Sequence, residues 1–174
     1  MEKIRVFVID PAWRQRKGGL RKSRGNQGRE LDYVTMEVPE IFGLLDREIF
    51  PLAEDDHCVF MWTIDRFLLE CENEMEKRGY KRHCRMIWNK LNGVAPAFTV
   101  RYSHEYLIWF YRKRLPPIAG EQRGKFMTVF AERSRQRHIA VNILVLILTL
   151  DLVVKSIEII RLVSELPPAV PAFP

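Results

Sequence analysis

The sequence predicts an α/β domain whose sheet is mostly parallel, with helices that cross over between successive strands. Short runs of β-branched and aromatic residues without a polar break are typical of buried strands, and such runs recur along the chain. Stretches with the helical spacing of apolar residues lie between the first three runs. The composition, 47% hydrophobic and 29% charged over 174 residues, is that of one globular domain with a sizeable core.

The elements can be assigned in chain order. Strands are predicted at Val6–Ile9, Cys58–Trp62, Cys84–Trp88 and Tyr106–Tyr111, and a fifth is open over Lys125–Phe130. The first helix is expected over Glu40–Phe50, because Pro51 cannot continue it. The second helix is expected to run from a cap at Asp65 to Arg78, with Gly79 as its stop.

The first strand ends in Asp10-Pro11-Ala12-Trp13, which we expect to be the active corner. Ligands of open α/β sheets bind outside the carboxyl ends of the strands, so an acid and an aromatic placed there face a cleft. The exocyclic amino nitrogen of adenine is a poor nucleophile, because its lone pair is delocalised into the ring. A carboxylate and a main-chain carbonyl beside proline can accept its two N–H bonds while the aromatic stacks on the base. The alternative is a strand-to-loop corner at which Trp13 fills the edge of the core.

A basic, glycine-rich stretch follows this corner. It holds seven basic residues and no acidic one, namely Arg14, Arg16, Lys17, Arg21, Lys22, Arg24 and Arg29. Low apolar content and high charge predict a loop. The chain has a net charge of +6 and a pI of about 9.4, which favours phosphate-bearing or acidic partners. We therefore expect the loop to clamp a nucleic-acid backbone, and the alternative is a solvated loop without a partner.

Further polar residues fall just beyond the ends of later strands: Lys90, Arg101, His104 and Glu105. We expect them to share one cleft with Asp10, although single residues of these types are also common as surface or cap residues. His104 beside Glu105 could also suggest an acid/base pair for hydrolysis, but neither a nucleophile nor a metal cluster accompanies them.

Metal binding and a disulfide framework are not expected. The four histidines are scattered, and Cys58, Cys71 and Cys84 have no C-x-x-C spacing. Each cysteine falls in an apolar element, which indicates reduced core thiols in a cytosolic protein. No signal peptide is recognised at the start of the sequence.

Beyond the Asp10–Trp13 corner, the chain carries a series of short motifs. They are Tyr33-Val34-Thr35-Met36, Glu40-Ile41, Phe60-Met61-Trp62, Gly79-Tyr80, Ile87-Trp88-Asn89-Lys90, His104-Glu105-Tyr106-Leu107 and Ala131-Glu132-Arg133. In this order they resemble the N(6)-adenine methyltransferases, which include the eukaryotic messenger-RNA adenosine methyltransferases and many phage and bacterial DNA adenine methylases. The resemblance runs from about Ile4 to Arg135. Each motif alone is weak, whereas the ordered set is specific.

The resemblance implies a Rossmann-like class I methyltransferase that binds S-adenosylmethionine and methylates the exocyclic amino group of adenine. The implied catalytic residues are Asp10, Pro11 and Trp13, which would hold the adenine, and Ala12, which would contribute backbone groups. The implied cofactor-binding residues are Asp10, Lys90, Arg101, His104 and Glu105. The implied substrate-binding residues are Tyr33, Trp62, Trp88, Asn89, Arg14, Arg16, Lys17, Arg21, Lys22 and Arg24.

DNA is favoured over RNA as the partner, because a compact chain looks more like the phage and bacterial members of the family. A target base in a duplex would have to be flipped out to reach Asp10 and Trp13. The expected location is the cytoplasm of a prokaryotic or phage-infected cell, and a dimer is left open. The alternative function is a catalytically impaired, nucleic-acid-binding remnant of such an enzyme.

The chain departs from the family pattern at two places. The first is Ala12, where the family usually has a second proline. Alanine keeps the carbonyl acceptor but loosens the backbone and adds an N–H, so we expect reduced rather than abolished activity.

The second departure follows Arg135, where the family continues with His-Ser-Arg-Lys-Pro-Asp and later residues that hold the cofactor. Back-translation of residues 138–142 from the third base of each codon permits His-Ser-Arg-Lys, so we predict a reading-frame change near Gln136. The chain is accordingly divided into a catalytic domain, residues 1–135, and an atypical apolar and proline-rich segment, residues 136–174.

The apolar run in that segment, Ile139–Leu150, is short for a membrane span. Asn142 and Asp151 would also be costly in lipid. We therefore favour a buried or partner-facing helix over a transmembrane one, with an aggregation-prone segment as a third option.

Overall fold

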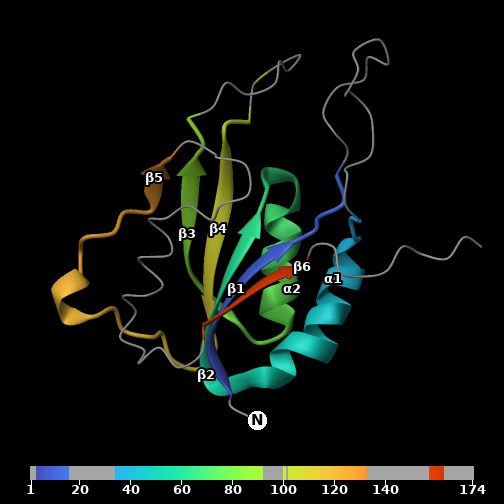
Figure 1. Ribbon diagram of the computed structural model, residues 1–174, viewed down its shortest axis with the longest axis horizontal. Helices are drawn as coiled ribbons and strands as arrows, with labels where there is room; N and C mark the ends of the chain where they lie inside the picture. Colours follow the sequence, from blue (N-terminus) through green and yellow to red (C-terminus); the bar gives the residue numbers. More distant parts are fainter. Residues whose placement is uncertain (1–2, 16–33, 92–99, 101, 133–156, 163–174) are drawn as a thin grey trace, which may run out of the picture.

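The computed structural model describes residues 3–15, 34–91, 100, 102–132 and 157–162, which form a six-stranded sheet and the helices packed on it (Figure 1). The strands are β1 (Ile4–Pro11), β2 (Ala53–Thr63), β3 (Lys81–Asn89), β4 (His104–Tyr111), β5 (Val129–Ala131) and β6 (Ile157–Leu162). The α-helices are α1 (Val38–Leu44) and α2 (Leu68–Lys77). A π-helix spans Leu45–Ile49, and 3-10 turns lie at Phe50–Leu52, Asp65–Phe67 and Gly120–Gln122.

The order of the described strands across the sheet is β5-β3-β4-β2-β1-β6, and β4 alone runs against the others. β1 is parallel to its neighbours β2 and β6, and β3 is parallel to β5. β4 lies between β2 and β3 and is antiparallel to both. The mostly parallel sheet is therefore confirmed. Because β4 is reversed, its first residues lie at the edge where the other strands end.

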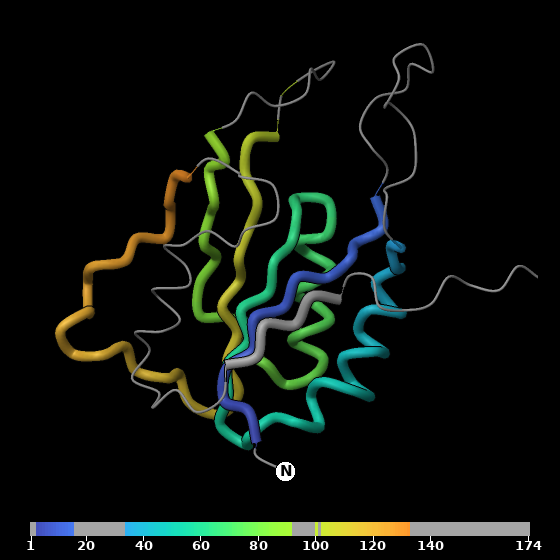
Figure 2. The backbone as a smooth tube through the Cα atoms, in the orientation of Figure 1, coloured from blue at the N-terminus to red at the C-terminus, as the bar shows by residue number. Residues whose placement is uncertain are grey.

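The helices α1 and α2 pack on the same face of the sheet. Figure 2 follows the chain from β1 through α1 to β2, and from β2 through α2 to β3. Phe42 of α1 and Met75 of α2 belong to the apolar cluster that contains Phe7, Met61 and Ile108 of the sheet. All five side chains are fully buried, and burial of each such side chain contributes roughly 1.5–3 kcal/mol. Both predicted helices are thus present. The first begins at Val38 instead of Glu40, and Pro51 lies within the 3-10 turn that follows the π-helix instead of ending the helical segment.

The second helix ends where the sequence predicts. Gly79 has a φ of +82°, a conformation that glycine adopts without a Cβ clash. The Gly79 N–H donates to the Glu76 carbonyl at 2.9 Å, and the Tyr80 N–H donates to the Met75 carbonyl at 3.1 Å. These two hydrogen bonds form a Schellman motif, which closes α2.

The start of this helix differs from the prediction. Asp65 lies in the 3-10 turn before α2, and the residue at the N-cap position of α2 is Phe67, without a side-chain cap. The Phe67 N–H donates to the Ile64 carbonyl at 3.0 Å, so a backbone turn leads into the helix instead of an aspartate cap. The predicted Asp65 cap is therefore wrong.

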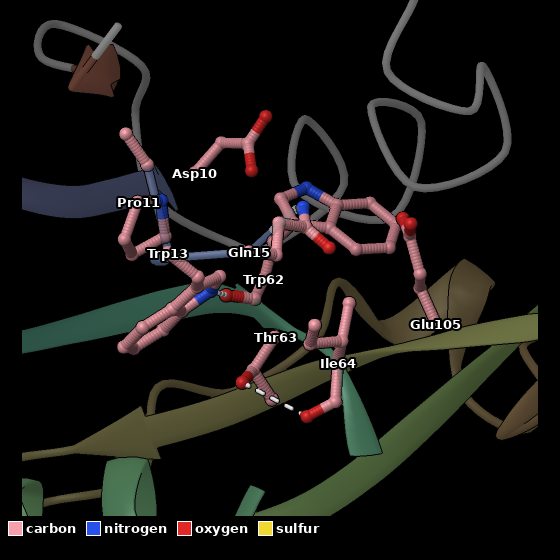
Figure 3. Close-up of a pocket in the computed structure, with 9 residues that line it drawn as sticks. Asp10, Pro11, Trp13, Gln15, Trp62, Thr63, Ile64 and Glu105 are labelled. Atoms are coloured by element: carbon pink, nitrogen blue, oxygen red, sulfur yellow. Dashed lines mark hydrogen bonds between the residues drawn. The ribbon is translucent and has the colours of Figure 1, made fainter. Parts of the chain in front are cut away.

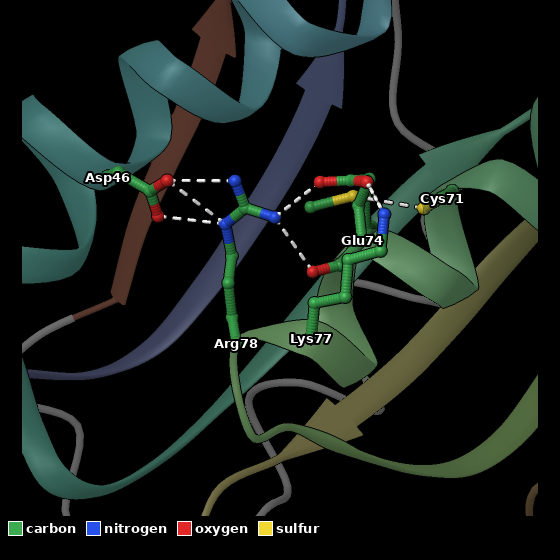
Figure 4. Close-up of polar contacts among 6 residues, drawn as sticks. Asp46, Cys71, Glu74, Lys77 and Arg78 are labelled. Carbon is green, nitrogen blue, oxygen red and sulfur yellow. Dashed lines mark hydrogen bonds and ion pairs between the residues drawn. The ribbon is translucent and has the colours of Figure 1, made fainter.

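Arg78 joins the end of α2 to the π-helix that continues α1 (Figure 4). Its Nε and Nη2 donate to the two carboxylate oxygens of Asp46, each at 2.8 Å. Its Nη1 donates to Glu74 Oε2 at 2.6 Å, and the guanidinium lies 4.7 Å from the centre of the Phe42 ring. The bidentate geometry fixes the relative position of the two helices.

The opposite face of the sheet is apolar as well. Val8, Phe60 and Trp109 are buried there on three neighbouring strands. Ile118 and Phe126, from the segment after β4, pack against this cluster. Strands that are buried on both faces read as unbroken apolar runs, which is the pattern that identified them in the sequence.

The strand β6 was not predicted. It lies within residues 136–174 and pairs with β1 from Val6↔Ile157 to Pro11↔Leu162. The apolar run at residues 139–150 lies outside the described residues, so its helical state and the domain boundary after Arg135 stay predictions. Within the described part of the chain, no helix has the length and apolar character needed to cross a membrane.

The three cysteines are free, as expected. Cys58 and Cys71 are buried and Cys84 is half-buried. Burial raises the pKa of the Cys58 thiol to about 12, so this group stays protonated at neutral pH.

His57 of β2 is a titratable group buried in the core. It is only 2% exposed, its Nδ1 contacts the Glu54 carbonyl, and its Nε2 lies 2.7 Å from the Tyr80 hydroxyl. Because a carbonyl can only accept, Nδ1 carries the proton and Nε2 accepts from Tyr80. Burial lowers the pKa of His57 below its ordinary 6.5, and the positive charge of Arg112 lowers it further, against the opposing effect of the Glu54 hydrogen bond.

We expect the free energy of unfolding to decrease as the pH falls below 6.5. In that range His57 takes up a proton in the unfolded chain but not in the folded one, so acid favours the unfolded state. The substitution His57→Gln should flatten this dependence in urea unfolding measured between about pH 7 and about pH 5. The control is His83→Gln, which removes an exposed histidine of β3. Equal pH dependence in the His57 variant and the parent would contradict the prediction.

Candidate functional site

A pocket of about 170 Å³ opens at the edge of the sheet where β1 and β2 end (Figure 3). It is lined by Asp10, Pro11, Ala12, Trp13, Gln15, Trp62, Thr63, Ile64 and Glu105. These residues come from the end of β1 and the segment after it, from the end of β2 and the residue after it, and from the start of β4. The pocket therefore lies at the position that the rule for open α/β sheets predicts.

The pleat of the sheet explains why Asp10, Trp62 and Glu105 meet. Side chains alternate along a strand, so residues two apart point to the same face. Asp10 follows Val8 on β1 and Trp62 follows Phe60 on β2, and Val8 and Phe60 are paired partners on the same apolar face. Because β4 is antiparallel, its second residue, Glu105, arrives at this edge.

Backbone hydrogen bonds define the shape of the corner. The Trp13 N–H donates to the Pro11 carbonyl at 2.8 Å, which closes a γ-turn centred on Ala12. The Met36 N–H donates to the Ala12 carbonyl at 2.8 Å, within a bridge between Trp13 and Met36. Each of the two carbonyls thus accepts one of these hydrogen bonds and has a second lone pair.

Trp13 lines the pocket but is mainly a supporting residue. Its side chain is 4% exposed, and its ring stacks on Phe67 with 5.3 Å between the ring centres and 16° between the planes. Its Nε1 donates to the Trp62 carbonyl at 3.0 Å. One ring face and the indole N–H are therefore occupied within the protein. This geometry favours the alternative in which Trp13 fills the edge of the core.

Trp62 is the aromatic side chain that points into the pocket. In Figure 3 its indole lies between the carboxylates of Asp10 and Glu105. Trp88 of β3 packs against it edge-on, with the ring centres 5.7 Å apart. Trp88 Nε1 in turn donates to the Glu132 carbonyl at 2.9 Å.

Lys90 reaches the site through Glu105. Its ammonium group forms an ion pair with the Glu105 carboxylate and lies 5.4 Å from the centre of the Trp88 ring. Both side chains of the ion pair are about a quarter exposed, and the pair is held over an aromatic ring. Of the predicted cofactor-binding residues, Asp10 and Glu105 thus line the pocket, and Lys90 is in direct contact with Glu105.

His104, Asn89 and Arg14 do not line this pocket. His104 is next to Glu105, so the pleat turns it to the other face, where its Nε2 lies 3.1 Å from the Tyr106 hydroxyl. The Asn89 side chain accepts a hydrogen bond from the Leu91 N–H at 3.2 Å. Arg14 is exposed and ion-paired with Glu37. The remaining predicted site residues lie outside the described residues: Tyr33, Arg16, Lys17, Arg21, Lys22, Arg24 and Arg101.

Three lining residues were missed from the sequence: Gln15, Thr63 and Ile64. Thr63 and Ile64 directly follow the predicted strand that ends at Trp62, so their position after a strand could have identified them. Gln15 lies within the stretch that we assigned to the basic loop, where the basic neighbours Arg14 and Arg16 gave no signal for an uncharged pocket residue. Within the described residues, no group of three or more His, Cys, Asp or Glu side chains could hold a metal ion.

Comparison with known proteins identifies the family. A family model described as MT-A70 matches residues 4–160. The chain belongs to the MT-A70 family. This is the N(6)-adenine methyltransferase family that the ordered motifs resemble. The match continues beyond Arg135 and includes four residues of β6.

Solved structures support the same fold for this MT-A70 chain. A crystal structure of the M1.HpyAVI–SAM complex has 14% sequence identity and a TM-score of 0.56, over 84% of this chain and 64% of that one. A crystal structure of M1.HpyAVI has 15% identity and a TM-score of 0.50, over 75% of this chain and 57% of that one. The chain therefore covers less than two thirds of the length of these proteins. No curated protein matches it.

The contacts of Trp13 lead to a prediction about stability. Trp13→Phe keeps an aromatic ring against Phe67 but leaves the Trp62 carbonyl without its indole donor, so the free energy of unfolding should decrease by about 1–2 kcal/mol. Trp13→Leu loses the ring stacking as well and should cost about 3 kcal/mol or more. Urea unfolding of both variants measures the difference. An unchanged stability of Trp13→Phe would show that the indole hydrogen bond does not support the corner.

Proposed function

We propose that this MT-A70 chain is an S-adenosylmethionine-dependent methyltransferase that acts on the exocyclic amino group of adenine in nucleic acid. The observation that carries the proposal is the placement of Asp10, Pro11 and Trp62 around one pocket at the carboxyl edge of the sheet. A carboxylate, a carbonyl and an aromatic wall are the groups that this reaction needs.

Asp10 and Pro11 act on the nucleophile. The Asp10 carboxylate accepts one N–H of the adenine amino group, and the second lone pair of the Pro11 carbonyl accepts the other. These two hydrogen bonds pull the nitrogen towards tetrahedral geometry and localise its lone pair for attack. The γ-turn at Ala12 fixes the direction of the Pro11 carbonyl before the base arrives, so little reorganisation is needed during the reaction.

Trp62 provides the wall against which the base packs. Trp13 acts behind it, because its indole N–H holds the Trp62 carbonyl and so keeps the end of β2 in place. Stacking of a base on an aromatic side chain contributes about 1–3 kcal/mol. The proposed role of Trp13 is therefore to position the base-binding wall, rather than to stack on the base itself.

The described pocket fits a base better than a base and a cofactor together. Its volume of about 170 Å³ is below the range of about 300–1,000 Å³ that is usual for sites of drug-sized ligands. The carboxylates of Asp10 and Glu105 suit the positive charge of S-adenosylmethionine, which would supply the methyl group. Lys90 would orient Glu105 through their ion pair. Arg101 and His104 stay proposed cofactor-binding residues from the family resemblance alone.

DNA is the proposed substrate, in preference to RNA. The net charge of +6 favours a polyanion, and the basic stretch beside the corner would neutralise its phosphates. A duplex would present the target base by flipping it out of the stack. The proposed location is the cytoplasm of a prokaryotic or phage-infected cell, and a dimer is compatible with the proposal.

A second candidate function is a nucleic-acid-binding remnant without activity. Two observations favour it: Ala12 replaces the second proline of the family motif, and the sequence after Arg135 departs from the family block. Isothermal calorimetry separates the two functions. Tight binding of S-adenosylmethionine supports the enzyme, and binding of nucleic acid alone supports the remnant.

The decisive test is methyl transfer from labelled S-adenosylmethionine to duplex DNA, single-stranded DNA and RNA, followed by nucleoside analysis. We expect label in N(6)-methyladenine, with more in DNA than in RNA. Asp10→Asn removes the carboxylate charge that binds the amino group and should reduce the rate by about a hundredfold or more. The control is Asp55→Asn, because Asp55 lies near the opposite end of β2 and is exposed. An equal loss in both variants, or label in another nucleoside, would contradict the proposal.

The γ-turn at Ala12 allows a substitution that should increase the rate of methyl transfer. Ala12 is the centre of the γ-turn and its φ is not positive, which is compatible with the fixed φ of proline near −65°. The substitution also removes the Ala12 N–H. Ala12→Pro should raise the rate of methyl transfer by about two- to fivefold, because fewer backbone conformations compete with the active one. The rate and the free energy of unfolding are measured side by side. A gain in stability without a gain in rate would mean that backbone freedom at Ala12 does not limit activity.

A further inference from the structure

Gln15 is a polar residue of the pocket that the family motif does not include. Its half-buried side chain lines the pocket beside Asp10 and Trp62 (Figure 3). The backbone on its amino side is anchored, because Trp13 forms a bridge with Met36. Arg14, which lies between Trp13 and Gln15, forms an ion pair with Glu37, the residue after Met36. The chain that leads to Gln15 is therefore held at Trp13 and Arg14.

The other polar groups of the pocket are mainly hydrogen-bond acceptors. Asp10 and Glu105, when ionised, can only accept hydrogen bonds. The Trp13 N–H is already used by the Trp62 carbonyl. The Thr63 hydroxyl donates to the Ile64 carbonyl at 3.4 Å. The side-chain donors that remain on the described wall are therefore the Trp62 N–H and the Gln15 amide. Of these, the Gln15 amide carries a donor and an acceptor next to each other in one plane.

Adenine presents the complementary pattern. Its amino N–H donors stand next to a ring nitrogen that accepts, on either side of the amino group. A glutamine amide can donate an N–H to such a ring nitrogen. The two amino N–H bonds are taken by Asp10 and the Pro11 carbonyl in the proposed function, so only this donated bond is assigned to Gln15. Guanine has an oxygen in place of the amino group, so it offers an acceptor where adenine offers donors.

We propose that Gln15 is a specificity-determining residue, whose amide N–H donates to the ring nitrogen beside the amino group of the target adenine. This inference rests on the proposed function and adds a second contact to it. Asp10 and Pro11 hold the amino group for reaction, and Gln15 donates a hydrogen bond to the ring nitrogen next to it. A base without that acceptor leaves the amide donor unpaired in the pocket, which lowers its affinity.

The test combines a variant with modified substrates. The oligonucleotides are ones that the wild-type protein methylates, with adenine, 7-deazaadenine or 1-deazaadenine at the target position. Each analogue lacks one ring nitrogen beside the amino group. We expect one of the two analogues to lower kcat/KM of the wild-type protein on the order of tenfold or more. Gln15→Leu should show a comparable loss with adenine itself and no further loss with that analogue.

Gln122→Leu is the matched control, because Gln122 lies in the 3-10 turn at Gly120–Gln122 and does not line the pocket. It should behave like the wild type with all three bases. Equal losses for the analogues in the wild type and in Gln15→Leu overturn the proposal. So does a Gln15→Leu variant that methylates adenine at the wild-type rate.

A binding measurement separates this inference from the proposed function. If the wild-type protein transfers no methyl group, the proposed function fails. The affinities of single-stranded oligo(dA) and its two deaza counterparts are then compared by fluorescence anisotropy. A preference for oligo(dA) over one counterpart that disappears in Gln15→Leu supports the contact. The same preference in both proteins, or none in the wild type, overturns it.

Discussion

The hydrogen bond from the Trp13 indole to the Trp62 carbonyl holds the two sides of the candidate site together. It joins the segment after β1 to the end of β2, and Phe67 packs on the Trp13 ring behind it. Asp10 and Pro11 precede Trp13 in the chain, so the same contact that fixes Trp13 also limits their movement. This buried donor therefore helps to set the position of the Asp10 carboxylate relative to the Trp62 ring.

The pleat of the sheet adds a second constraint. Polar residues at neighbouring strand ends share a pocket only if they point to the same face, and the face is decided by the register of each strand. Trp62 and Glu105 satisfy this condition with Asp10, whereas His104 does not, although it is adjacent to Glu105. The reversed direction of β4 is equally necessary. A parallel β4 would place Glu105 at the far edge of the sheet.

The sequence predicted the central strands, the two helices and the corner at Asp10–Trp13, because each of these depends on local chemistry. Unbroken apolar runs, a glycine stop and an acid-proline-x-aromatic group can be recognised one segment at a time. The direction of β4 could not be predicted, since the apolar run at Tyr106–Tyr111 is equally compatible with either direction. The burial of Trp13 at the corner depends on a contact with Trp62, 49 positions away in the sequence, which no local pattern contains.

Residues 157–162 show how part of the segment 136–174 supports the sheet. They form β6, which pairs with β1 along its length and ends beside Pro11. Without this strand, one edge of β1 would have unpaired backbone groups up to the residue before the γ-turn. The corner would then be held only by β2 and by the bridge between Trp13 and Met36. Only backbone pairing is needed for this support, so a tail whose sequence departs from the family block can still hold β1 in place. The support that β6 gives to the corner at Asp10 is therefore independent of which side chains follow Arg135.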